Sequence, residues 1–179
     1  MKLLEETKKF VDSKFRPDQL PHFDRTLYWV KKLKPDADEA LQIAAYSHDI
    51  LRGFGIAYFQ LKHLGIQGFY EHHQKEGAKI MIKFLKTKTD DKKLIKRVGY
   101  LVGNHEFGGD DAANLLKDAD SISFFEKNAE RFISKIDDYG YDFMKDKFNF
   151  MFNRITSEKA KKIARPMYED AMSKLEKLN

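Results

Sequence analysis

Histidine and acidic side chains are the groups in this sequence best suited to hold a metal ion. The chain contains no cysteine, which excludes disulfides and thiolate metal sites and leaves imidazole and carboxylate ligands. Nitrogen and oxygen ligands without sulfur suit Mn, Mg, Ni, Co, Fe or Zn and do not distinguish among them. These residue types therefore favour a divalent metal ion as cofactor.

Most of the histidines fall near the ends of expected helices. His22 follows a proline break and opens a helix, the doublet His48–Asp49 ends another, and His105 ends a third. The pair His72–His73 lies near the start of a helix that we expect over 69–86. Side chains at helix ends converge on a common pocket more easily than those in mid-helix, so this placement favours a shared site.

Two aspartates, Asp118 and Asp120, lie on a helix whose other residues are mostly apolar. A carboxylate buried without a partner costs several kcal/mol, and imidazoles with a divalent cation are suitable partners. Ordinary roles are open as well: Asp120 pairs with Lys117, Asp49 caps a helix end, and any single histidine is a structural residue or lies on a solvated face.

Helical periodicity dominates the sequence, and no segment alternates with the period of two that marks a strand. We expect an all-α fold, a single-domain helical bundle of about eight helices over 1–179, in which 52–69 is mainly loop. Asp90 and Thr156 are expected helix caps, and Pro166 is expected to kink or break the last helix. The other expected helices cover 1–15, 22–34, 35–50, 91–105, 112–127, 127–138 and 141–155.

Composition restricts the class of protein. Hydrophobic residues make up 42% of the chain and include 15 Phe, enough for a packed core. No apolar run approaches the ~20 residues of a membrane span, and the N-terminal segment is amphipathic, so we expect a cytoplasmic protein. The net charge of +5 comes from lysines interspersed with acids. This pattern tolerates a small anionic substrate and argues against a nucleic-acid partner.

The order of these residues resembles the HD-domain superfamily of metal-dependent phosphohydrolases. In that family a histidine, a His–Asp doublet and a distant aspartate lie on an all-helical bundle, and the corresponding residues here are His22, His48–Asp49 and Asp120. The similarity extends over about 20–125. The helices expected within 127–179 are not covered by it.

Neighbouring residues support the resemblance. "HFDR" places Arg25 three residues after the first histidine, and "HDILR" is similar to "HDIGK" with Arg52 in place of the lysine. "HQKEGAKI" favours His73 over His72, and "KDADSIS" favours Asp120 over Asp118. The family's "HH" step is similar to "VGNHE", where Glu106 replaces the second histidine.

The resemblance implies a role for each matched residue. His22, His48, Asp49 and Asp120 are the implied ligands of one metal, with His73 and His105 available to a second. The implied catalytic residues are Asp49, His73 and His105, where the histidines contact phosphate or donate a proton to the leaving oxygen. Arg25 and Arg52 are implied to bind substrate phosphate, with a surface ion pair as the alternative for each. Positive charge at the pocket mouth would come from Lys62, His63 and Lys75.

The function implied is hydrolysis of a small phosphorylated substrate, such as a nucleotide, by a metal-activated water. Two alternatives stay open. Some HD-type proteins contain a di-iron centre, so an oxygenase is compatible with His73 and His105. A module that binds a metal or a nucleotide without catalysis is the other, although all four core ligand positions are retained.

Overall fold

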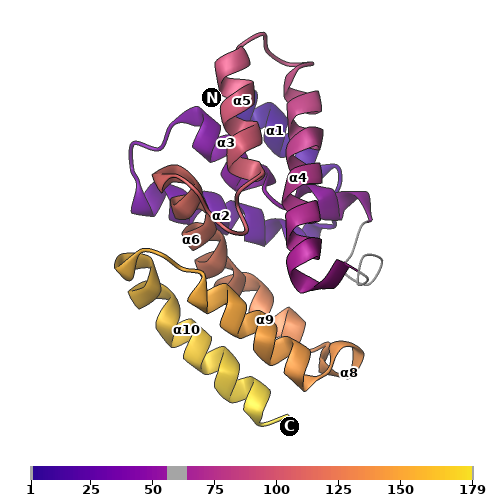
Figure 1. Cartoon of the computed structure of the whole chain (residues 1–179), viewed down its shortest axis with the longest axis vertical. Helices are drawn as coiled ribbons and strands as arrows, with labels where there is room; N and C mark the ends of the chain where they lie inside the picture. The colour runs from indigo at the N-terminus through magenta and orange to yellow at the C-terminus, as the bar shows by residue number, and fades with distance from the viewer. Residues whose placement is uncertain (1, 56–63, 179) are drawn as a thin grey trace.

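The computed structural model describes residues 2–55 and 64–178, and within them every regular element is helical (Figure 1). The expectation of an all-α bundle is confirmed. The eight longer helices are α1 (Lys2–Asp12), α2 (Leu20–Leu33), α3 (Glu39–Ser47), α4 (Gly65–Leu85), α5 (Lys92–Val102), α6 (Asp111–Ser123), α9 (Tyr141–Asn153) and α10 (Glu158–Glu176). The short elements are α7 (Ala129–Ile133), α8 (Ile136–Tyr139), 3₁₀ turns at Pro17–Gln19 and Ile50–Phe54, and a π-helical turn at Phe124–Asn128.

Side-chain caps define where several helices begin, and two lie one residue beyond the expected position. Asp91, rather than Asp90, accepts hydrogen bonds from the backbone N–H groups at the start of α5. Ser157, rather than Thr156, accepts from the N–H of Ala160 at the start of α10. Such caps satisfy backbone donors that the helix itself leaves without partners.

Two expected boundaries were wrong, and the break that was one of the two expectations for Pro166 is absent. Helix α4 begins at Gly65, so His72 and His73 lie well inside it and not in its first turn. The long helix expected over 127–138 is replaced by the π-helical turn and the short α7 and α8. Helix α10 continues through Pro166. Pro166 and Lys162, whose carbonyl loses its donor, are both exposed, so water can satisfy that carbonyl.

The core consists of two hydrophobic clusters. The first is formed by side chains from α1 to α6, and the second by residues from Ile122 to Leu175. Figure 1 shows α9 and α10 side by side, below α1 to α5. Trp29 and Leu33 of α2 pack against both clusters. Trp29 also donates its indole N–H to Glu126 of the π-helical turn at 2.8 Å, so the two clusters meet at α2.

Close contact between α4 and α5 depends on a glycine. A Cβ atom at Gly99 would lie 2.6 Å from the Cδ1 atom of Ile82, closer than carbon atoms can approach. The absent side chain lets the two helices pack tightly, and the ring centroids of His73 and His105 lie 5.3 Å apart. None of the helices in 2–55 and 64–178 combines the length and apolar character needed to cross a bilayer.

Candidate metal centre

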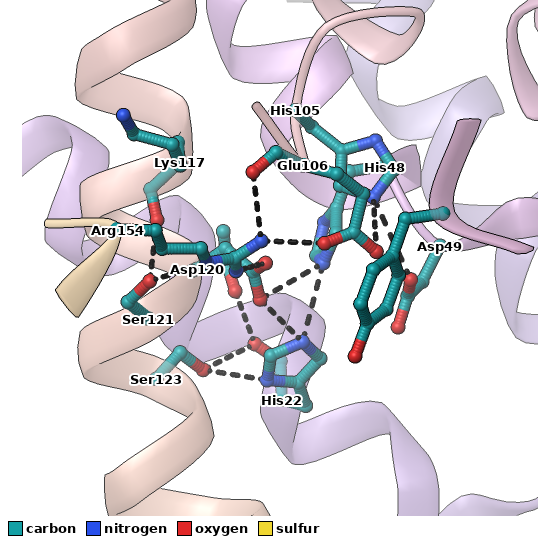
Figure 2. Close-up of polar contacts among 12 residues, drawn as sticks. His22, His48, Asp49, His105, Glu106, Lys117, Asp120, Ser121, Ser123 and Arg154 are labelled. Atoms are coloured by element: carbon teal, nitrogen blue, oxygen red, sulfur yellow. Dashed lines mark hydrogen bonds and ion pairs between the residues drawn. The ribbon is translucent and has the colours of Figure 1, made fainter. Parts of the chain in front are cut away.

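A first histidine group consists of His22 from the first turn of α2, His48 just after α3, and Asp120 of α6. The Oδ1 atom of Asp120 lies 3.1 Å from the Nε2 atom of His22 and 3.3 Å from that of His48. The two Nε2 atoms are 3.2 Å apart. All three residues are buried, and Figure 2 shows them facing one another. Three potential metal ligands therefore point at a common position.

Hydrogen bonds on the far side of each ring determine where its proton lies. Ser123 donates its hydroxyl hydrogen to the carbonyl of His22 at 2.8 Å, so its Oγ atom accepts from the Nδ1–H of His22 at 2.9 Å. The Nδ1–H of His48 donates to the carbonyl of Ala45 at 3.0 Å. Each neutral imidazole carries one N–H, so both Nε2 atoms present lone pairs.

These lone pairs face each other and the carboxylate of Asp120, an arrangement of three electron-rich atoms that repel one another. A cation between them would remove this repulsion. Metal-binding histidines commonly donate their other N–H to a carbonyl or another acceptor, as both rings do here. The first histidine group therefore fits a divalent metal ion.

A second histidine group lies beside the first and consists of Asp49, His73, His105 and Glu106. The Nε2 atom of His73 is 2.7 Å from the Oδ1 atom of Asp49. The Nε2 atom of His105 is 3.8 Å from the same oxygen and 3.6 Å from the Oε1 atom of Glu106. Ring contacts join the groups, because the centroids of His48 and His105 are 5.2 Å apart. Seven candidate ligands thus form two adjacent groups.

His105 provides an unsatisfied atom in the second group. Its Nδ1–H donates to the carbonyl of Val102 at 2.7 Å, and its buried Nε2 atom has no hydrogen-bond partner among the described residues. Burial lowers the pKa of His105, but the carboxylates of Asp49 and Glu106 outweigh this effect and raise it to about 10. The position beside His105 therefore attracts positive charge, as a metal site would.

The carboxylates of the two groups remain ionised. Burial alone would raise the pKa of Asp120, but the charge of Arg154 holds it well below its usual range. Asp49 behaves in the same way, because the charge of Arg52 and the hydrogen bond from His73 overcome burial and lower its pKa.

Two of the histidines are kept neutral instead. Burial lowers the pKa of both His22 and His73. The centre therefore combines charged carboxylates with neutral imidazoles at His22 and His73, the protonation states that bind metals.

Arg154, which follows α9 directly, joins the two groups (Figure 2). Its guanidinium donates to the Oε2 atom of Glu106 at 2.5 Å and also to the Oδ2 atom of Asp120. Arg52 lies 3.0 Å from the Oδ2 atom of Asp49. Three carboxylates and two guanidiniums give the two groups a net charge of −1 when the histidines are neutral.

A cavity of about 50 Å³ opens onto both groups. One water needs ~10–15 Å³ on this scale, so the cavity holds about four water-sized groups. Arg52, Arg131 and Lys147 line it together with His22, Asp49, Glu106 and Asp120. Lys147 is nearly buried and donates to the hydroxyl of Tyr70 at 3.0 Å. The cavity therefore combines candidate metal ligands with three cationic side chains.

The four residues expected to share one metal lie in different groups. The structure brings His22, His48 and Asp120 together, whereas Asp49 lies with His73, His105 and Glu106. The doublet His48–Asp49 thus contributes one residue to each group.

Of the two arginines expected to bind phosphate, Arg52 lines the cavity and Arg25 does not. Arg25 donates to Glu126 at 2.8 Å, and its guanidinium lies 3.8 Å from the centre of the Tyr28 ring, which matches the ion-pair alternative. Lys75 is exposed beside Glu71. Lys62 and His63 lie outside the described residues.

Residues 5–175 match a family model described as a domain of unknown function, DUF4202. The chain belongs to this family. Neither the comparison with curated proteins nor the comparison with solved structures found a match. The DUF4202 match extends beyond 20–125 and includes the C-terminal helices, so those helices are part of the family's domain.

Four residues of the candidate metal centre and its cavity were only weakly indicated by the sequence. Glu106 stood out only as a substitution in the "HH" step, although its carboxylate completes the second group. Arg154, Lys147 and Arg131 come from the C-terminal helices, where basic residues are frequent. Arg154 ends the aromatic-rich segment "FNFMFNR". Its position after so many apolar side chains was the one sequence signal for a buried cation.

Proposed function

We propose that this protein is a metal-dependent phosphohydrolase that acts on a small phosphate ester, of which a nucleotide is one example. One observation carries the proposal: a single cavity is lined by two adjacent groups of histidines and carboxylates and by three cationic side chains. The first feature suits divalent metal ions, and the second suits a phosphate.

Some residues of the cavity would bind the metal ions, and others would bind the substrate. His22, His48 and Asp120 would hold one divalent ion, and Asp49, His73, His105 and Glu106 offer the ligands of a second. The chemistry that a bound ion supplies is activation of a water and polarisation of a phosphoryl oxygen. Arg52, Arg131 and Lys147 would bind and orient the phosphate, because a cationic wall attracts the substrate's charge.

Charge balance favours a doubly charged substrate. With all histidines neutral, as metal ligands require, the two groups carry −1, so one divalent ion brings them to +1 and two ions bring them to +3. Arg131 and Lys147 add to this excess. A phosphate monoester dianion offsets it, whereas a neutral substrate would leave buried positive charge without a partner.

The order of ligands agrees with the proposal. A histidine, a His–Asp doublet and a distant aspartate resemble the HD-domain phosphohydrolases, and the buried His22, His48 and Asp120 cluster is compatible with an HD-type site. The proposed hydrolase activity therefore rests on this resemblance together with Arg52 and the cavity that it lines.

A di-iron oxygenase is a second candidate because the second histidine group is complete, with two imidazoles and two carboxylates. Metal analysis of protein purified anaerobically separates the candidates. Two iron ions per chain with oxygen consumption would favour the oxygenase, and a single Mn, Mg or Ni would argue against it.

Phosphate release from a panel of phosphate monoesters and nucleotides tests the hydrolase. The assay should follow removal of metal and separate addition of Mn, Mg, Ni, Co, Fe and Zn. We expect metal-dependent hydrolysis that is lost in His48→Ala and Asp49→Ala. The matched control is His72→Ala, because His72 neighbours His73 on α4 but belongs to neither group.

Full activity in both His48→Ala and Asp49→Ala would overturn the proposal. Nucleotide binding by calorimetry without release of phosphate would instead favour a binding module.

A further inference from the structure

The side chain of Arg154 donates a hydrogen bond to one carboxylate oxygen in each histidine group. Its Nη1 atom donates to Glu106 Oε2 at 2.5 Å, and its Nη2 atom donates to Asp120 Oδ2. Its Nε atom donates to the hydroxyl of Ser121 at 2.9 Å. Only 5% of the side chain is exposed, so all three contacts are made away from solvent.

The second oxygen of each carboxylate faces the histidines. Asp120 Oδ1 lies 3.1 and 3.3 Å from the two Nε2 atoms of the first histidine group. Glu106 Oε1 lies 3.6 Å from the Nε2 atom of His105. Arg154 therefore leaves each carboxylate a single oxygen for a metal and directs the two oxygens toward different groups.

The loop that carries Arg154 is fixed to the helix that carries Asp120. Both oxygens of the buried Asp118 accept backbone N–H groups, from Thr156 at 2.7 Å and from Ser157 at 2.8 Å. Lys117 donates to the hydroxyl of Thr156 at 2.7 Å. Asp118, two residues before the ligand Asp120, thus holds the loop between α9 and α10 against α6.

We propose that Arg154 is a positioning residue of the metal centre, which makes Asp120 and Glu106 single-oxygen ligands of two separate metal positions. The proposal rests on the metal centre of the proposed function. The planar guanidinium presents donors to both carboxylates and Ser121 at once, whereas a lysine ammonium is a compact point charge that cannot span the three acceptors. The C-terminal helices would thereby set the geometry of a centre whose ligands all come from α2 to α6.

Titration of metal-free protein with Mn(II) tests this role in Arg154→Lys, which keeps the charge and removes the fork. We expect Mn(II) affinity to fall roughly 10- to 100-fold, as for other groups that orient ligands. The electron paramagnetic resonance spectrum of bound Mn(II), which reports ligand geometry, should also change. Arg165→Lys is the matched control, because Arg165 lies on the exposed face of α10, 4.0 Å from Glu169.

The outcomes separate this proposal from the proposed function. Wild-type protein that binds no Mn(II) would remove the metal centre and both proposals with it. Wild-type protein that binds Mn(II), with the same affinity and spectrum in Arg154→Lys, would overturn the role of Arg154 alone.

Circular dichroism establishes whether Arg154→Lys is folded. If it is not, Asp118→Asn replaces it, because this change weakens the attachment of the loop and alters no candidate ligand. Weaker Mn(II) binding by Asp118→Asn supports the proposal, and unchanged binding overturns it.

Discussion

The two histidine groups lie side by side but support their imidazoles differently. In the first group, the outer nitrogen of His22 is bonded to Ser123 and that of His48 to a backbone carbonyl. In the second group, His105 is anchored in this way, but the buried Nδ1 atom of His73 has no hydrogen-bond partner among the described residues. His73 is held through the nitrogen that faces Asp49.

Charge does not explain a preference between the groups. The first has one carboxylate, which shares Arg154, and the second has two, which pair with Arg52 and the same Arg154. Each group is therefore largely compensated by guanidinium charge. The second group offers four candidate ligands and the first three, but the imidazoles of the first group are the better oriented, and ligands fixed before binding lose less entropy when the metal arrives. We expect the first group to bind metal more tightly.

Asp49→Ala should have the largest effect of the changes that separate the groups. The second group loses a carboxylate that contacts both of its histidines, so we expect its metal affinity and the hydrolysis rate to fall by more than ~100-fold. The first group should keep its metal. Mn(II) titration and phosphate release measure the two effects, with the exposed Asp36→Ala as control. Loss of both metal positions would contradict the division into two groups.

Ser123→Ala should weaken the first group alone. The change removes the acceptor that fixes the ring proton of His22, and such outer partners typically contribute 10- to 100-fold in metal affinity. Calorimetry should show weaker binding at the tighter site and unchanged binding at the other. Ser134→Ala, in an exposed turn, is the matched control. Equal weakening at both sites would show that the groups do not act separately.

Arg52→Ala and Arg25→Ala should differ in their effect on KM. Arg52 lines the cavity beside the second group, and a lost hydrogen bond between charged groups costs about 1.5–3 kcal/mol, so KM should rise roughly tenfold or more. Arg25 pairs with Glu126 outside the cavity lining, and its removal should leave KM unchanged. Steady-state kinetics with one phosphate ester decides the matter, and equal effects would contradict the assignment.

His72→Ala should have the smallest effect. Although it adjoins His73, it belongs to neither group, and substitutions away from a site typically change stability by less than ~0.5 kcal/mol. Metal content and melting temperature should match the wild type. Loss of metal from this variant would indicate that His72 is a ligand and would contradict its exclusion from the second group.

Most of the fold could be predicted from the sequence, because the local spacing of apolar residues identifies an amphipathic helix. The helical periodicity around Leu27 and Val30 predicted α2, and the buried residues of α2 follow that spacing. The prediction failed where backbone geometry depends on distant packing. The aromatic residues after Phe124 suggested one long helix, but they form a π-helical turn and two short helices around the second cluster.

The candidate site was predictable only in part. His22, His48 and Asp120 could be grouped because their order resembles a known pattern, and the structure places their ligand atoms together. The division of His48 and Asp49 between two groups depends on the 3₁₀ turn that begins after Asp49, which local spacing does not specify. The role of Arg154 could not be predicted from the sequence for a similar reason, because its partner Glu106 is 48 residues away in the chain.

The junction at Trp29 gives this protein a built-in optical reporter. It is the only tryptophan in the chain, and its indole contacts both hydrophobic clusters and Glu126. Intrinsic fluorescence excited in the indole band therefore arises from the interface between the N-terminal and C-terminal helices. Separation of the clusters would expose the indole to water and shift its emission to longer wavelength, without any attached dye.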